Sequence, residues 1–98
     1  MPVKPAYNLL ILFVLRSAGE QGSYGLDIKV KIDAAMLGEV MSVGTLYNCL
    51  SRHKTDGLIE EIGPIKSEKG GGYRVYYRIT KQGLVALDQV DKVIFALQ

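Results

Sequence analysis

The chain has 98 residues, of which 48% are hydrophobic, which suits one small globular domain and excludes an intrinsically disordered chain. Its formal net charge of +2 is compatible with a nucleic-acid partner without requiring one. The single cysteine, Cys49, excludes an internal disulfide, and the longest apolar run, Leu9 to Leu15, is shorter than the roughly 20 residues that cross a bilayer. Because so short a chain buries a limited share of its surface, a second subunit would supply additional core.

The first predicted helix covers residues 6–18, between Pro5 and Gly19, where nothing interrupts helical structure. Seven successive apolar residues place hydrophobic side chains all around this helix. We therefore expect one side to face the core of the domain and the other to face a second subunit. The first residues show no signal-peptide pattern, which favours a cytoplasmic location.

The second predicted helix runs from about Tyr24 to Met36. Its apolar residues alternate over 26–32 as in a strand, but Ile28, Ile32 and Ala35 also fall on one helical stripe, and we favour the helix. The charged residues between them are then expected on the side that faces solvent.

A third helix is predicted to begin after Ser42, whose side chain is suited to cap the first turn. It is expected to end near Gly57, a residue that readily adopts the left-handed conformation found at helix ends. Leu46, Leu50 and His53 follow one helical row, so this row is predicted to be buried.

Two strands are predicted next, over residues 58–65 and 73–79. The second is clearer, because its apolar residues alternate strictly with Arg74, Tyr76 and Arg78. The connection over 66–72 contains lysines and three glycines, which indicates a flexible and basic hairpin tip.

A last helix is predicted after Thr80, a second candidate cap. Its apolar residues recur at spacings of three, four and three, as in a helix that packs along another helix. Packing against its own domain explains the same pattern equally well. Together with the helix over 6–18, this helix over 81–98 forms the expected dimer surface. The residues expected there are Leu9, Leu12, Phe13, Leu87, Val90, Ile94 and Leu97.

The order of elements is three helices, two strands and a helix, with a short turn before the third helix and a basic hairpin after it. This layout predicts a mainly α fold with a small β-hairpin. It is that of a winged helix-turn-helix, with a three-helix core, a two-stranded wing and a C-terminal helix. The winged-helix domain is expected over residues 1–80.

The same segments resemble those of a known family in their order and spacing. The motifs that carry the likeness are Leu9-Leu10, Tyr24-Gly25, Ile28-Lys29, Gly44-Thr45-Leu46-Tyr47, Leu50, Arg52, Gly57-Leu58-Ile59, Tyr76-Tyr77-Arg78-Ile79-Thr80 and Gly83. Together they resemble the PadR-like transcriptional regulators, over most of the chain. The family usually has proline, leucine and an acid where this chain has Val43, His53 and Lys54. Larger members carry a long C-terminal dimerisation region, so this chain is similar to the compact members.

The resemblance implies a homodimer that represses transcription by occupying a pseudo-palindromic promoter site. It therefore implies double-stranded DNA and a second copy of the chain as partners, no cofactor, and a small aromatic effector as a further candidate. Any such effector must bind the two states of the dimer with different affinity.

The expected DNA contacts combine a helix N-terminus, outward polar side chains and a basic wing. Asn and Arg are side chains that read adenine and guanine in the major groove. For Tyr47 the alternative is a place in the core, and for Arg52 it is a surface salt bridge. The expected DNA-binding residues are Ser42, Gly44, Thr45, Tyr47, Asn48, Ser51, Arg52, Lys54, Lys66, Lys69 and Arg74.

Other functions find little support in the sequence. His53 is the only histidine and has no ligand cluster at metal-binding spacing, and no nucleophile–base pair is present, so an enzyme is not expected. Gly70 to Gly72 lack the Lys-Ser/Thr ending of a nucleotide-binding loop. The main alternative is a winged helix that binds protein, because the net charge is modest and acids lie near the hairpin. If DNA is the partner, Glu60 and Glu61 are expected to face away from it.

Overall fold

The computed structural model describes residues 6–67 and 70–98. Its elements in chain order are α1 (Tyr7–Ala18), the 3₁₀ turn η1 (Gly19–Gln21), β1 (Ser23–Tyr24), α2 (Gly25–Ala35), α3 (Val43–Thr55), β2 (Ile59–Lys66), β3 (Tyr73–Ile79) and α4 (Lys81–Ala96). This arrangement is a winged helix with a C-terminal helix, so the predicted fold class is confirmed.

The three N-terminal helices pack around one hydrophobic core. Ile28 and Ile32 of α2 are buried there, as the helical stripe predicts, whereas Ala35 is exposed and Met36 is half-buried instead. The α3 row of Leu46, Leu50 and His53 is buried as predicted. The core anchors the inner side of α3, which fixes the side that α3 presents outward.

The sheet has three antiparallel strands in the order β1-β3-β2, and only the last two were predicted. The strand that sequence analysis missed, β1, pairs Ser23 with Tyr77 and Tyr24 with Tyr76. Two residues are too few to show alternation, and only the pairing with β3 reveals this strand. β2 and β3 form the wing, with an irregularity in their pairing between Ile62 and Pro64.

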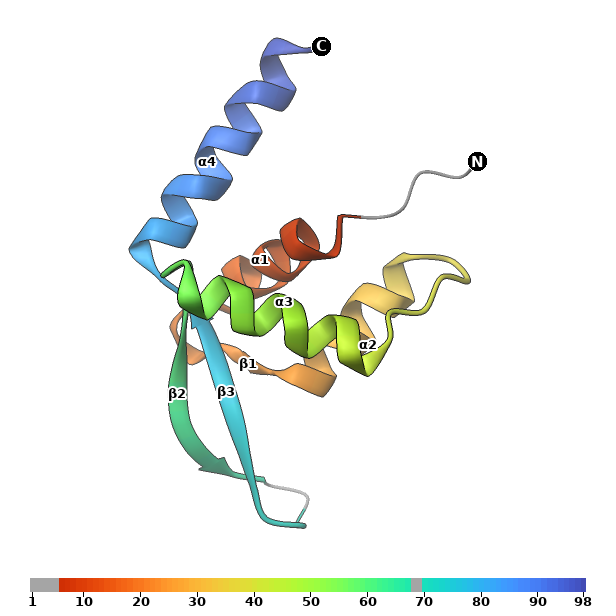
Figure 1. The fold of residues 1–98 in the computed structure, drawn as a ribbon, viewed down its shortest axis with the longest axis vertical. Coiled ribbons are helices and arrows are strands. Elements are labelled where there is room, and N and C mark those ends of the chain that lie inside the picture. The colour runs from red at the N-terminus through yellow and green to blue at the C-terminus, as the bar shows by residue number, and fades with distance from the viewer. Residues whose placement is uncertain (1–5, 68–69) are drawn as a thin grey trace.

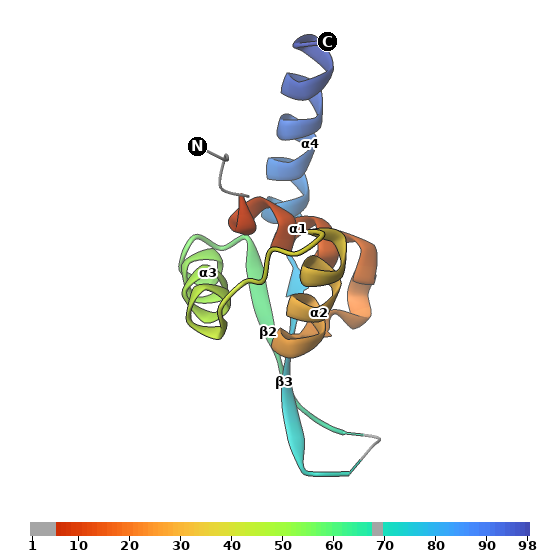
Figure 2. The ribbon, with the colours of Figure 1, turned by 90° about the vertical axis from the view of Figure 1, so that its right-hand side faces the viewer.

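Two elements project from the body in opposite directions (Figure 1 and Figure 2). The hairpin of β2 and β3 extends at one end, and most of α4 extends at the other. α4 begins where Thr80 accepts a hydrogen bond from the Gly83 amide at 3.1 Å, which confirms the predicted cap. In the C-terminal half of α4 all residues except the half-buried Val90 are exposed, and Asp91 there forms an ion pair with Arg16 of α1.

Candidate nucleic-acid interface

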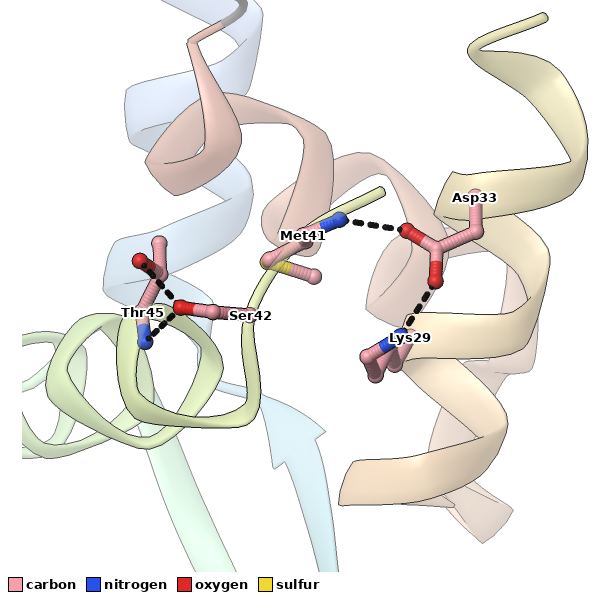
Figure 3. A network of polar contacts seen from close by, with 5 residues as sticks. All are labelled: Lys29, Asp33, Met41, Ser42 and Thr45. Atoms are coloured by element: carbon pink, nitrogen blue, oxygen red, sulfur yellow. Dashed lines mark hydrogen bonds and ion pairs between the residues drawn. The ribbon is translucent and has the colours of Figure 1, made fainter. Parts of the chain in front are cut away.

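The start of α3 is built by a side-chain cap. Ser42 has extended backbone geometry, and its Oγ accepts a hydrogen bond from the Thr45 amide at 3.1 Å (Figure 3). The same hydroxyl donates to Thr45 Oγ1 at 2.9 Å. Capping uses one of the free amides of the first turn, and the others are left for solvent or a ligand.

A carboxylate of α2 holds the turn that leads into α3. Asp33 Oδ1 accepts a hydrogen bond from the Met41 amide at 2.9 Å, and its Oδ2 accepts from Lys29 Nζ at 2.5 Å (Figure 3). Met41 itself is buried in the core. The Lys29 hydrogen bond first, and then the Met41 amide, hold the pKa of Asp33 below its ordinary value of 3.8. Asp33 thus fixes the position of α3 relative to α2.

Replacing Asp33 by asparagine is expected to destabilise the domain at neutral pH. The amide oxygen still accepts from Met41 but loses the charge that pairs with Lys29. A carboxyl whose folded pKa is lowered stabilises the fold above its unfolded pKa, and this contribution disappears as the pH falls through the folded pKa. The difference between wild type and Asp33→Asn should therefore shrink below about pH 4, as measured by urea unfolding between pH 7 and 3.

Asp88→Asn serves as the control for Asp33→Asn. Asp88 pairs with Lys92 on the exposed surface of α4, where both side chains are mostly open to solvent. Its replacement should leave the unfolding midpoint unchanged across the same pH range. A constant difference between wild type and Asp33→Asn from pH 7 to 3 would refute the role given to this carboxylate.

The outward side of α3 is polar. Gly44, Asn48, Ser51 and Thr55 lie along it and are exposed. α3 contains neither aspartate nor glutamate, so this side carries no negative charge. Three predicted residues of α3, Gly44, Asn48 and Ser51, are thus brought together on an exposed helical face without acids, which suits an anionic partner.

The flank of α3 that faces the wing is less basic than predicted. Lys54 Nζ lies 2.5 Å from Glu61 of β2, and this hydrogen bond, supported by the charge of Glu61, raises the pKa of Lys54. Tyr47 is 45% exposed, and its hydroxyl lies close to Gly25, so it belongs partly to the body and partly to the surface. Lys54 is therefore already neutralised by a carboxylate, which sequence analysis had placed on the far side of the wing.

Lys66 and Arg74, the predicted phosphate contacts of the wing that the structure describes, belong to opposite faces of the two-stranded hairpin. Lys66 pairs across the strands with Tyr73, and the adjacent pair is Ile65 with Arg74, so their side chains alternate. Lys66 shares the α3 side with Glu61, whereas the Arg74 guanidinium lies 4.2 Å from the centre of the Tyr24 ring. Arg74 nevertheless lines the groove between α3 and the wing, together with Tyr47 and Tyr73, so its contact with DNA stays a prediction. Lys69 lies outside the described residues.

Glu60 and Glu61 also fall on opposite faces. Glu60 pairs with Arg78, on the same side as Arg74 and away from α3, as predicted. Glu61 is on the α3 side, contrary to prediction, and Lys54 neutralises it there. On the strand face that carries Glu61, Lys66 is therefore the charged side chain that forms no ion pair with a described residue.

An aromatic groove separates α3 from the wing. It has a volume of about 290 Å³, and its aromatic lining comes from Tyr24, Tyr47, Tyr73 and Tyr77. Tyr73 is 70% exposed and places a phenol hydroxyl on the α3 side of the wing. Sequence analysis assigned Tyr73 only to an alternating strand, because its exposure depends on how far the hairpin extends beyond the body.

The opposite flank of α3 meets the first turn of α1. A cleft of about 190 Å³ there is lined by Asn8, Thr45, Asn48, Cys49 and Arg52. Within residues 6–67 and 70–98, Arg52 has no carboxylate partner, so the salt bridge considered as the alternative for it is absent from this part of the chain. Burial raises the pKa of the Cys49 thiol.

The model of the transcriptional regulator PadR-like family matches residues 14–89, which span α2, α3, the wing and half of α4. The chain belongs to the PadR-like family of transcriptional regulators. Members of this family are regulators and not enzymes, which agrees with the sequence-based prediction.

Solved PadR-like structures share the fold over almost the whole chain. A PadR-like transcription factor from Bacteroides fragilis is 28% identical, with a TM-score of 0.74 over 92% of this chain and 81% of that one. A PadR-like regulator from Bacillus cereus is 26% identical, with a TM-score of 0.75 over 92% and 82%. RosR of H. salinarum is 30% identical, with a TM-score of 0.68 over 96% and 74%. None of the curated proteins compared matches the chain.

The residues expected at a dimer surface divide into three groups by burial. Leu12 and Leu87 are buried in the core of the subunit itself, so they are unavailable to a partner and that expectation is corrected. Ile94 and Leu97 are 44% and 81% exposed on the projecting part of α4. The partly covered members of the set are Leu9, Phe13 and Val90.

The described residues contain neither a candidate metal site nor a candidate membrane span. No three His, Cys, Asp or Glu side chains gather there in a way that could hold a metal ion. Of the helices in this part of the PadR-like chain, none combines the length and the apolar character needed to span a membrane.

Proposed function

We propose that this PadR-like regulator binds double-stranded DNA as a homodimer and represses transcription by occupying a pseudo-palindromic promoter site. The observation that carries the proposal is the outward side of α3, which is polar, exposed and free of acids. An α-helix has a diameter of about 10–12 Å and fills a major groove about 12 Å wide. α3 is therefore the recognition helix of the proposal.

The outward residues of α3 have the chemistry to contact base edges and phosphates. Asn48 is suited to the edge of adenine, Arg52 is suited to guanine or to a backbone phosphate, and Ser51 lies beside them. Ser42, Gly44 and Thr45 surround the first turn, where free amides and the helix dipole favour a phosphate. Backbone contacts position the protein on DNA and base contacts select the sequence, and α3 carries residues suited to both kinds of contact.

The wing would contact the backbone on its own side of the groove. Lys66 and Tyr73 lie on the side of the hairpin that faces α3, and Tyr47 of α3 lines the same groove as Tyr73. The Arg74 guanidinium lies over the Tyr24 ring and also lines this groove. Among the described residues, the wing contribution thus rests on Lys66, Arg74 and the Tyr73 hydroxyl.

Dimerisation is supported by apolar side chains that are exposed in the single subunit. The last turns of α4 expose Val93, Ile94, Phe95 and Leu97, on an arm that projects from the body (Figure 2). Burying such side chains against a second copy is favourable by about 25 cal/mol per Å². A twofold dimer would present two α3 helices to successive major grooves about 34 Å apart. A small aromatic effector that favours another spacing would relieve repression.

The test is the salt dependence of binding to a pool of 30-base-pair duplexes with a randomised centre. Arg52→Ala and Lys66→Ala should each lower the slope of log affinity against log salt by about 0.9, the value for one lost phosphate contact. Lys92→Ala, which removes an exposed cation of α4, is the charge-matched control and should leave the slope unchanged. Equal slopes in all four proteins would contradict the proposed interface.

A second candidate function is a winged helix that binds protein. It is favoured by the ion pair of Lys54 with Glu61, which lowers the free positive charge beside α3. The same duplex pool distinguishes the two. Absence of any mobility shift at low salt and high protein concentration would favour the protein partner.

A further inference from the structure

The cleft between α1 and α3 is formed by residues far apart in the sequence. Asn8 lies in the first turn of α1, and Thr45, Asn48 and Arg52 lie along the adjacent flank of α3. Its volume of about 190 Å³ is several times the roughly 30 Å³ share of one water molecule in the liquid. It therefore has room for a small polar group.

A buried histidine fixes the two sides of the cleft. His53 Nε2 lies 2.7 Å from the main-chain oxygen of Asn8, and the ring is 5% exposed. This contact joins the last turns of α3 to the first turn of α1. Because the oxygen belongs to the main chain, the side chain of Asn8 remains free to contact a ligand and can be changed without removing the link.

The chemistry of the cleft suits an anion. Its lining contains amides, a hydroxyl, a thiol and the guanidinium of Arg52, and it contains no carboxylate. A guanidinium binds phosphate oxygens through two parallel hydrogen bonds, and amide and hydroxyl groups donate further ones. A phosphate group satisfies these donors together.

The position of the cleft matches that of a DNA strand. A helix that fills the major groove has one phosphate backbone along each flank. The wing covers one flank of α3, where Lys54 meets Glu61, and the cleft lies on the other, where Arg52 meets Asn8. We propose that this cleft binds a backbone phosphate of the DNA and that Asn8 of α1 contacts it directly, an inference that rests on the proposed function.

The principal test is Asn8→Asp, which places a negative charge in the cleft without changing the shape of the side chain. Affinity for the duplex pool should fall about tenfold or more at low salt, because like charges are brought together. The second residue of a helix favours an acid, so folding should be unaffected or slightly improved, as measured by thermal unfolding. Gln89→Glu, the same change on exposed α4, is the matched control and should bind like wild type.

A second readout uses the single cysteine, which lines the same cleft. Alkylation of Cys49 by iodoacetamide should slow when saturating duplex is added, because the bound strand covers the thiol. In the double variant Cys49→Ser/Gln89→Cys the single thiol is on α4, and its alkylation should be unaffected by duplex.

The outcomes separate the two proposals. If wild-type protein binds no duplex, the proposed function fails and the phosphate cleft fails with it. If wild type binds and Arg52→Ala lowers the salt slope, while Asn8→Asp binds like Gln89→Glu and Cys49 is alkylated at the same rate with duplex, only the cleft is refuted.

Discussion

A Gly83→Ala variant is expected to unfold at a markedly lower urea concentration than wild type. A methyl group at this position would lie 2.3 Å from the main-chain oxygen of Leu58 and 2.6 Å from Cγ1 of Ile79. Since the nearest atom is backbone, the clash is relieved only by moving α4 away from the wing. Overpacking of this kind costs about 1–3 kcal/mol. The higher helix propensity of alanine offsets at most about 1 kcal/mol of this destabilisation.

The same displacement would weaken the start of α4. The Gly83 amide donates to Thr80 Oγ1 at 3.1 Å, and the Thr80 hydroxyl in turn donates to the main-chain oxygen of Gly57 at 2.6 Å. These bonds connect α4 to the end of α3. Loss of a cap costs typically about 1 kcal/mol more, so the total effect is large for a domain of this size.

Gly63→Ala is the matched control for Gly83→Ala. A methyl group there meets nothing within 4 Å, and the residue is exposed in the wing. Its unfolding midpoint should stay close to that of wild type, within about 0.5 kcal/mol. A Gly83→Ala protein as stable as Gly63→Ala would show that α4 does not pack on the body as described.

Replacing both Ile94 and Leu97 by aspartate is expected to convert the proposed dimer into a folded monomer. Both side chains are exposed on the projecting part of α4, so the change should leave the fold of the subunit intact. Two charges within an apolar interface remove its driving force. Sedimentation equilibrium measures the change in mass, and circular dichroism measures the retained helix.

Loss of the dimer should reduce DNA affinity far more than any single contact does. Two linked recognition helices gain about 10²- to 10⁴-fold over one, because the second binding event is intramolecular. Leu37→Asp, at a 93% exposed site in the turn before α3, is the control and should remain a dimer. A double variant that stays dimeric would place the interface elsewhere, and a monomer with unchanged affinity would contradict binding by two subunits.

The helices were predictable because their signals are local. The Ser42 and Thr80 caps lie within three residues of the amides that they accept, and the buried row of α3 follows directly from helical spacing. Gly57 has a φ of 77°, the left-handed conformation expected from its predicted place at the end of the helix. Such features depend on neighbours along the chain and are therefore visible without coordinates.

The candidate interface was predictable only in part. The outward residues of α3 follow from the same periodicity, but the charges around them do not. Lys54 forms an ion pair with Glu61, seven residues later in the sequence. The Arg74 guanidinium lies over the ring of Tyr24, a residue of another strand. Neither partner can be chosen from the sequence, because each depends on the register of the hairpin and on its docking beside α2.

The number and order of the helices, the Ser42 and Thr80 caps, the alternating wing strand and the motifs of the PadR-like family can all be read from the amino-acid sequence. The folded chain adds that Ser23 and Tyr24 form a strand, that Leu87 is core and not interface, and that Asn8 lies beside Arg52. The two sets of features depend on interactions that act over different separations along the chain. Backbone hydrogen bonding and periodicity act within a few residues, whereas burial, ion pairing and the walls of a cleft arise where distant segments meet.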